Sequence, residues 1–193
     1  MKRVVVTLLV LALVAGVGYY AFSRYLVSRL DGAGGVVAPR SDLVVFESDH
    51  IGISFKYPNI YEATTTHAGN AERDWHAVVL LPKGYMPPQG GEGPPAITLQ
   101  DIPNPESLGL EAWVKGDARS NYKLSGDGAM TAGQIDGAEA IFYAHSGLYE
   151  FDAAAVAHDG KVFLFEVSYD TQHNPIRSDF QNLLKTVQFT DAR

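Results

Sequence analysis

The sequence predicts an α+β domain in which an antiparallel β-sheet is flanked by helices. Short runs rich in β-branched and aromatic residues alternate with turn residues along most of the chain after residue 42. Two Asp-Gly pairs, Asp136-Gly137 and Asp159-Gly160, separate such runs, and this is a strong signal for β-hairpins. One helical pattern interrupts the strands and another closes the chain, as in α+β folds.

An apolar run near the N-terminus predicts a membrane anchor. The nineteen residues Val4–Phe22 carry no charge and follow a short basic start. As a helix they would span about 28 Å, close to the hydrocarbon thickness of a bilayer. We therefore expect an anchor helix over residues 1–30 that binds the membrane through residues 4–22. A cleaved signal peptide is the alternative, because Ala21 and Ser23 form a small-x-small pattern.

The chain after the anchor is expected to lie outside the cytoplasm. A short basic N-terminus before an apolar run is typical of a signal anchor, so we predict a single-pass membrane protein with its domain on the extracytoplasmic side. Residues 31–42 are rich in glycine and lack a helical stripe, which predicts a flexible linker. The folded domain is then expected over residues 43–190.

Five strands are expected in the first half of the domain. In the second of them, alternate residues from Ile51 to Tyr57 are apolar and share one face, and Pro58 ends the strand because it has no N–H to donate. The five expected strands are Leu43–Glu47, Ile51–Tyr57, Tyr61–Thr66, Trp75–Leu81 and Ala96–Ile102.

Four more strands are expected in the second half. The last of them has apolar side chains on both faces, which predicts a central strand covered on both sides. These strands are Met130–Ile135, Ala138–His145, Leu148–Ala157 and Lys161–Tyr169.

Two helices are expected within the domain. The first, Leu110–Ala118, begins after Gly109 and turns Trp113 toward the core. The second follows Asn174 as a cap and Pro175 at its first position. Its apolar stripe consists of Ile176, Phe180, Leu183, Leu184 and Val187.

The charge and cysteine content exclude several classes of function. Four of the 15 basic residues and none of the 22 acidic residues precede Asp31, so the rest of the chain carries 11 basic against 22 acidic side chains. Nucleic-acid binding is excluded, because phosphate contacts need clustered Lys and Arg. The absence of cysteine excludes disulfides, thiolate metal sites and a cysteine nucleophile.

The sequence contains no catalytic motif, and we expect no enzyme activity, no cofactor and no metal site. Ser146 lies between two hairpin strands rather than in a nucleophile elbow. Glu150 and Asp152 alternate on one strand face, and a solvent-facing strand edge explains them. None of the histidines has the spacing of a metal motif, and His145 and His158, at the two ends of a hairpin arm, are the best pair. The histidines are His50, His67, His76, His145, His158 and His173.

A long irregular segment, Pro82–Pro95, is the candidate partner-binding loop. It holds five prolines and four glycines in fourteen residues, which is long for a loop in a compact domain. Tyr85 and Met86 are expected to be exposed apolar side chains that suit a protein contact, together with Pro87 and Pro88. A tolerated surface insertion is the alternative.

Five segments together resemble the PsbP-like domain family over roughly residues 43–190. They are IGISFKYP at Ile51–Pro58, LGLEAWVK at Leu108–Lys115, GQIDGAEAIFYAHSG at Gly133–Gly147, DGKVFLFEVSY at Asp159–Tyr169 and SDFQNLLKTVQF at Ser178–Phe189. The resemblance implies an α/β/α sandwich that acts as a binding or assembly module. Relatives include extrinsic subunits of photosystem II, a Ran-binding protein and envelope proteins tethered to bacterial membranes. A role in oxygen evolution does not follow, since this chain carries its own anchor.

Two hypotheses of function remain. The first is a membrane-tethered envelope protein with a non-catalytic PsbP-like binding module, whose partner is another envelope protein. The second is a small-ligand or lipid carrier, or an enzyme, that uses a cleft between the sheet and the helix at Leu110–Ala118. The second requires convergent polar residues in an apolar pocket, whereas the first requires only an exposed patch.

Overall fold

The computed structural model describes residues 42–67, 75–86 and 93–190, all within the second of two compact units, Val37–Arg193. The expected anchor over residues 1–30, and the expected linker up to residue 41, lie outside the described residues. Within those residues, no helix has both the length and the apolar character that a membrane span requires.

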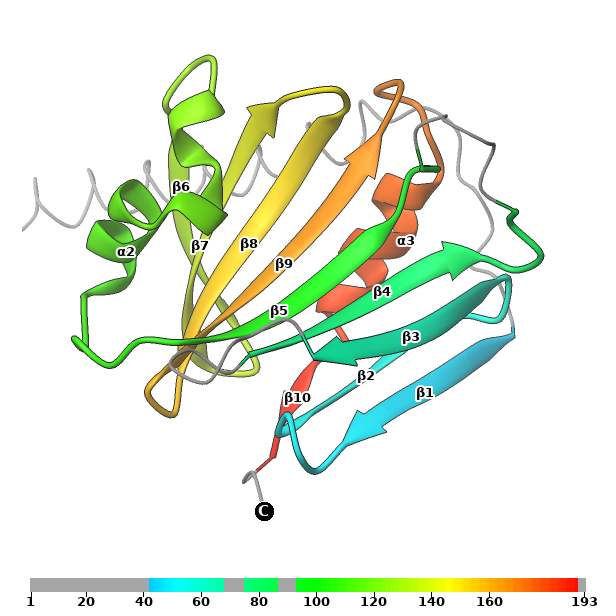
Figure 1. The fold of residues 1–193 in the computed structure, drawn as a ribbon, viewed down its shortest axis with the longest axis horizontal. Coiled ribbons are helices and arrows are strands. Elements are labelled where there is room, and N and C mark those ends of the chain that lie inside the picture. Colours follow the sequence, from blue (N-terminus) through cyan, green and yellow to red (C-terminus); the bar gives the residue numbers. More distant parts are fainter. Residues whose placement is uncertain (1–41, 68–74, 87–92, 191–193) are drawn as a thin grey trace, which may run out of the picture. The chain divides into compact units, whose positions relative to one another are not determined.

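The described residues form two antiparallel sheets (Figure 1). The large sheet has the strand order β3-β4-β5-β9-β8-β7-β6, and the small sheet has the order β1-β2-β10. The sequence predicts one sheet, whereas β2 pairs with β1 and β10 and not with β3. The strands are β1 Leu43–Ser48, β2 Ile53–Pro58, β3 Tyr61–His67, β4 His76–Pro82, β5 Ile97–Pro103, β6 Met130–Ile135, β7 Ala138–Ser146, β8 Glu150–His158, β9 Lys161–Tyr169 and β10 Gln188–Phe189.

Two α-helices occur in the described part, α2 (Leu110–Gly116) and α3 (Ile176–Leu184). Helix α2 ends two residues before the predicted boundary, because Asp117 is extended and its carboxylate accepts a hydrogen bond from the backbone N–H of Arg119. Helix α3 follows Pro175. The N-cap is Pro175 and not Asn174 as predicted, although the side chain of Asn174 does accept a hydrogen bond from the N–H of Ile176 at 3.1 Å.

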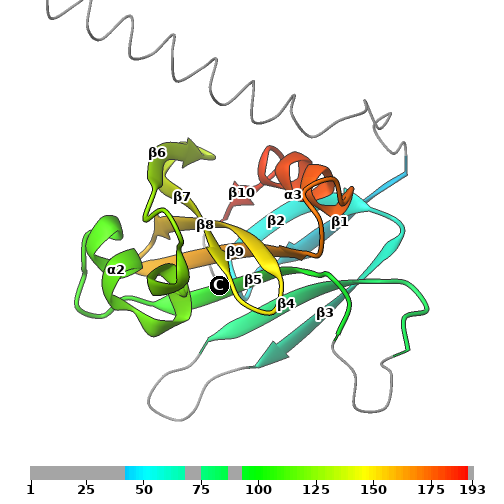
Figure 2. The same ribbon diagram turned by 90° about the horizontal axis from the view of Figure 1, so that it is seen from above.

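Strand β9 lies at the centre of the large sheet and is buried on both faces, as predicted. Phe163 and Phe165 pack in one cluster with β2 and α3. Val162 and Leu164 point to the other face and pack in a second cluster with α2. The large sheet therefore lies between α2 on one face and α3 with the small sheet on the other (Figures 1 and 2).

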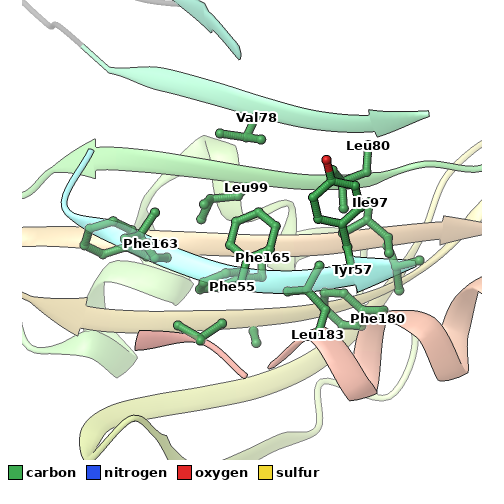
Figure 3. Packing of buried hydrophobic residues seen from close by; sticks show 14 of the residues in the cluster. Phe55, Tyr57, Val78, Leu80, Ile97, Leu99, Phe163, Phe165, Phe180 and Leu183 are labelled. Atoms are coloured by element: carbon green, nitrogen blue, oxygen red, sulfur yellow. The ribbon is translucent and has the colours of Figure 1, made fainter. Parts of the chain in front are cut away.

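The larger core fills the space between the two sheets. Figure 3 shows Phe55 of β2 and Phe180 and Leu183 of α3 around Phe165 of β9, with Val78 of β4 above them. Each of these side chains is exposed by 3% or less. The small sheet is therefore held to the large one by apolar packing, since β2 shares no ladder with it.

Both predicted Asp-Gly turns are confirmed. Asp136 and Gly137 have φ of 49° and 77°, and Asp159 and Gly160 have φ of 46° and 70°. Two consecutive residues with positive φ are the mark of a type I′ turn, whose twist matches that of the flanking strands. These turns fix the registers of the β6–β7 and β8–β9 hairpins.

Truncating the centre of β9 should unfold the domain readily. We expect Phe165→Ala to lower the free energy of unfolding by about 3–5 kcal/mol, since it removes a fully buried ring and leaves a cavity. Urea unfolding followed by circular dichroism measures this change. The control Val45→Ala, at a side chain that is 57% exposed, should shift the free energy by no more than about 0.5 kcal/mol. Equal effects of the two substitutions would contradict the arrangement of the core.

Candidate functional site

The segments at one end of the domain are held together by backbone hydrogen bonds. The described chain enters there at Asp42, whose carbonyl oxygen accepts a bond from the N–H of Asn59 at 2.8 Å. The carbonyl oxygen of Ile60 accepts a bond from the N–H of Lys83, also at 2.8 Å. The start of β1, the turn between β2 and β3 and the end of β4 are therefore neighbours. We call this end the entry end.

Three large apolar side chains are exposed at the entry end. Leu43 is 52% exposed, Ile60 is 43% exposed and Met86 is 84% exposed. We call these three residues the entry surface. Single exposed apolar residues are ordinary on a protein, but neighbouring ones on adjoining segments are typical of a contact site.

The predicted partner-binding loop contributes to the entry surface through Met86. The side chain of Tyr85 is half-buried and therefore less exposed than the sequence predicts. The backbone N–H of Tyr85 donates to the carbonyl oxygen of Pro82 at 3.1 Å. Pro87 and Pro88 lie outside the described residues. Sequence reasoning missed Leu43 and Ile60, because their place at the same end of the domain as Met86 depends on how distant segments pair.

An ion pair covers Asp152, and the prediction of a solvent-facing strand edge is wrong for this residue. Strand β8 lies between β7 and β9. The Asp152 carboxylate accepts hydrogen bonds from Arg177 Nε at 2.8 Å and from the Tyr169 hydroxyl at 3.1 Å. Glu150 is exposed and accepts a hydrogen bond from Ser146 Oγ at 2.7 Å. The two carboxylates thus take part in separate structural contacts and do not form an acid–base pair.

The environment of Tyr169 shifts its ionisation. Burial of the phenol raises its pKa, the nearby Asp152 carboxylate raises it further, and together they bring it to about 12. The Arg177 guanidinium lies 4.4 Å from the centre of the Tyr169 ring and opposes this shift. The phenol therefore stays neutral and donates to Asp152.

A second buried polar pair lies on the face of the large sheet that packs against α2. His145 Nε2 is 3.0 Å from Glu166 Oε1, and both side chains are buried. The His145 ring stacks on Phe151 with centroids 4.5 Å apart. His145 and His158 are not brought together, because they lie at opposite ends of the β8 ladder, beside Phe151 and Lys161.

Three histidines that are distant in the sequence lie close together at the end of the domain opposite to the entry end. His50, in the turn between β1 and β2, places its Nε2 atom 3.0 Å from Nε2 of His76. His67 lies directly opposite His76 in the β3–β4 ladder, with ring centroids 5.5 Å apart. His76 Nδ1 lies 3.4 Å from Oδ1 of the buried Asp101. Within the described ranges, no three His, Cys, Asp or Glu side chains form a group that could hold a metal ion.

The space between α2 and the sheet is filled by the side chains of the helix. Leu110, Trp113 and Val114 are each exposed by 2% or less. They pack in one cluster with Ala153 and Ala155 of β8, whose small side chains let the helix approach the sheet closely. The predicted ligand cleft would require this packing to open.

The comparisons with known proteins address the fold. No family model matches the chain, and no curated protein matches its sequence. Among solved structures, it is similar to the solution structure of cyanobacterial PsbP (CyanoP) from Synechocystis sp. PCC 6803. The TM-score is 0.53 at 15% sequence identity, and the match covers 81% of this chain and 96% of that chain. The domain has the PsbP fold. The PsbP-like resemblance of the five sequence segments is thereby confirmed as a likeness of fold.

The ionisation of Tyr169 provides a test of the Asp152 cluster. In ¹³C NMR of tyrosine-labelled protein, with Tyr169→Phe to assign the signal, we expect a midpoint at about pH 12. Because the folded pKa lies above the ordinary value of about 10, this phenol adds stability below pH 10 that is lost as the pH rises towards 12. Asp152→Asn should lower the midpoint. A midpoint at the ordinary value in the unsubstituted protein would contradict the structure at this site.

Proposed function

We propose that this protein is a membrane-tethered, non-catalytic binding or assembly module of the cell envelope. Residues 4–22 hold it in the membrane, the domain lies outside the cytoplasm, and the entry surface binds another envelope protein. One observation carries the proposal: exposed apolar side chains lie on bonded segments at the end of a PsbP-fold domain where the described chain begins.

The size of the entry surface fits a weak contact that a tether makes effective. Burying apolar surface contributes about 25 cal/mol per Å², so three side chains alone give only modest affinity. A flexible linker over residues 31–42 would have a mean reach of about 20 Å. Restricting the domain to that distance from the membrane raises the local concentration of a membrane-bound partner, and a weak contact then suffices.

Charge favours a protein partner over the lipid surface itself. The chain from Asp31 onward carries twice as many acidic as basic side chains. Anionic lipid headgroups attract clusters of Lys and Arg and repel an acidic domain. An apolar contact on an acidic domain therefore suits a protein whose surface is apolar or basic.

The polar residues of the interior support a non-catalytic role. Asp152 is held by Arg177 and Tyr169, and His145 is paired with Glu166. These are the residue types that acid–base catalysis would use, and here they hold one another in ion pairs and hydrogen bonds within the fold.

Membrane tethering is tested by fractionation. We expect the full-length protein to remain in the membrane pellet after an alkaline carbonate wash. The wash disrupts the electrostatic contacts of peripheral proteins, but it does not remove an apolar helix that spans the bilayer. A form that begins at Asp42 should be released into the supernatant. Mass spectrometry of the mature protein is the control, since a protein shortened near Ala21–Ser23 and found in the soluble fraction would favour the cleaved signal peptide.

The entry surface is tested by cross-linking in membranes with Met86→Asp. One cross-linked envelope protein is expected with the unsubstituted chain, and at least about tenfold less of it with the variant, since a charge at the centre of an apolar contact costs 1.4 kcal/mol or more. Leu108→Asp is the matched control. Leu108 is 41% exposed and bonds to Asn104, beside the β8–β9 turn at the other end of the domain. Equal yields with both variants would rule out the entry surface as the binding site.

A further inference from the structure

We propose that His50 and His76 form a binding site for a divalent transition-metal ion, Zn²⁺ or Cu²⁺, and that Asp101 positions His76 within it. This site lies at the opposite end from the entry surface and does not depend on the proposed function.

The distance between the Nε2 atoms of His50 and His76 is close to that of two imidazole ligands on one metal ion. Their Nε2 atoms are 3.0 Å apart, and the two rings stand edge to face, with centroids 4.5 Å apart and planes at 83°. Two imidazole nitrogens bound to one zinc ion at about 2.0–2.1 Å in tetrahedral geometry are separated by about 3.3–3.4 Å. A shift of a few tenths of an ångström between these atoms, together with a rotation of the His50 ring, would give a chelating pair. His50 is exposed and lies on a turn, so it can supply this shift.

The protonation of the pair favours binding by His76 Nε2. A contact between two neutral imidazole nitrogens needs one N–H donor and one lone pair. His76 Nδ1 is buried, has no hydrogen-bond partner among the described residues and lies 3.4 Å from the Asp101 carboxylate. A proton on this atom faces the carboxylate and leaves the Nε2 lone pair free. His50 is then the donor, and moving its proton to its Nδ1 atom frees the second lone pair without changing any charge.

The Asp101 carboxylate faces Nδ1 of His76, the ring nitrogen on the side away from His50. It is 2% exposed, accepts a hydrogen bond from Lys161 Nζ at 2.9 Å and accepts another from the backbone N–H of His76. A carboxylate facing the second nitrogen of a metal-binding histidine sets its tautomer and makes it a better ligand. Asp101 is therefore a positioning residue and not a ligand.

The donor atoms decide the kind of ion. Both ligands are imidazole nitrogens, which suit Zn²⁺ and Cu²⁺, whereas Mg²⁺ and Ca²⁺ require oxygen ligands. Among the described residues, no third His, Cys, Asp or Glu completes the group. Such a site binds reversibly and more weakly than a structural site with four protein ligands.

Binding would also join the two sheets. His50 belongs to the turn of the small sheet and His76 to β4 of the large one. The two sheets otherwise meet through apolar packing and a hydrogen bond from the N–H of Phe189 in β10 to Asp136 in the β6–β7 turn, so a shared metal ion adds a bond between them. An ion that binds only the folded state raises its stability.

Isothermal titration of the full-length protein with Zn²⁺ tests the site. The protein is purified in detergent without a polyhistidine tag and treated with a chelator beforehand. We expect one Zn²⁺ per chain, affinity lost by at least about tenfold in Asp101→Asn, and no binding at this site in His50→Ala. His173→Ala, which removes an exposed histidine before α3, is the matched control and should bind as the unsubstituted protein does.

The thermal transition gives a second readout. Zn²⁺ should raise the melting temperature of the unsubstituted protein and of His173→Ala, and should leave that of His50→Ala unchanged. His50 lies on an exposed turn, so its substitution removes the ligand without opening the core. Unchanged Zn²⁺ affinity in His50→Ala, equal losses in His50→Ala and His173→Ala, or no binding at millimolar Zn²⁺ would each overturn the proposal.

Discussion

Burial of β9 on both faces is the constraint on which the rest of the structure depends. Alternate residues of the strand face α3 with the small sheet, and the others face α2. A slip of one residue would exchange the two sets, so the registers of β5 and β8 against β9 are strongly specified. Asp101 lies opposite Phe163 in that register, on the side of the small sheet, and Asp152 lies opposite Val167. The polar clusters are thus placed by apolar packing.

The sequence predicts the elements well and their long-range arrangement poorly, for a physical reason. Hairpin turns at Asp136 and Asp159 and the apolar stripe of α3 are encoded within a few residues. The alternation in β2 predicts a buried face but does not say which strand β2 pairs with, and the second sheet was missed for this reason. The meeting of His50 with His76 likewise depends on contacts between two sheets. His67 and His76 flank one hairpin, and only an assumed register would have paired them.

The fold itself says little about activity, because one architecture serves many functions. Within the described interior, ionisable groups are held in pairs, as with Asp152 and Arg177. The two ends of the domain differ in chemistry. One presents Leu43 and Met86, and the other brings His50 against His76, which lies beside Asp101. A module with two such ends has room for a partner at one and an ion at the other without competition between them.

The place where the chain enters the domain has a mechanical consequence. Residues before Asp42 lead directly into β1, the edge strand of the small sheet, at the open end of its hairpin with β2. Interstrand hydrogen bonds lie perpendicular to the strands, so a pull across the hairpin at Asp42 loads them one pair after another, beginning with the bond from Asn59. Such unzipping needs far less force than shearing a whole strand. For a pull in this direction we expect β1 to separate before the strands of the large sheet.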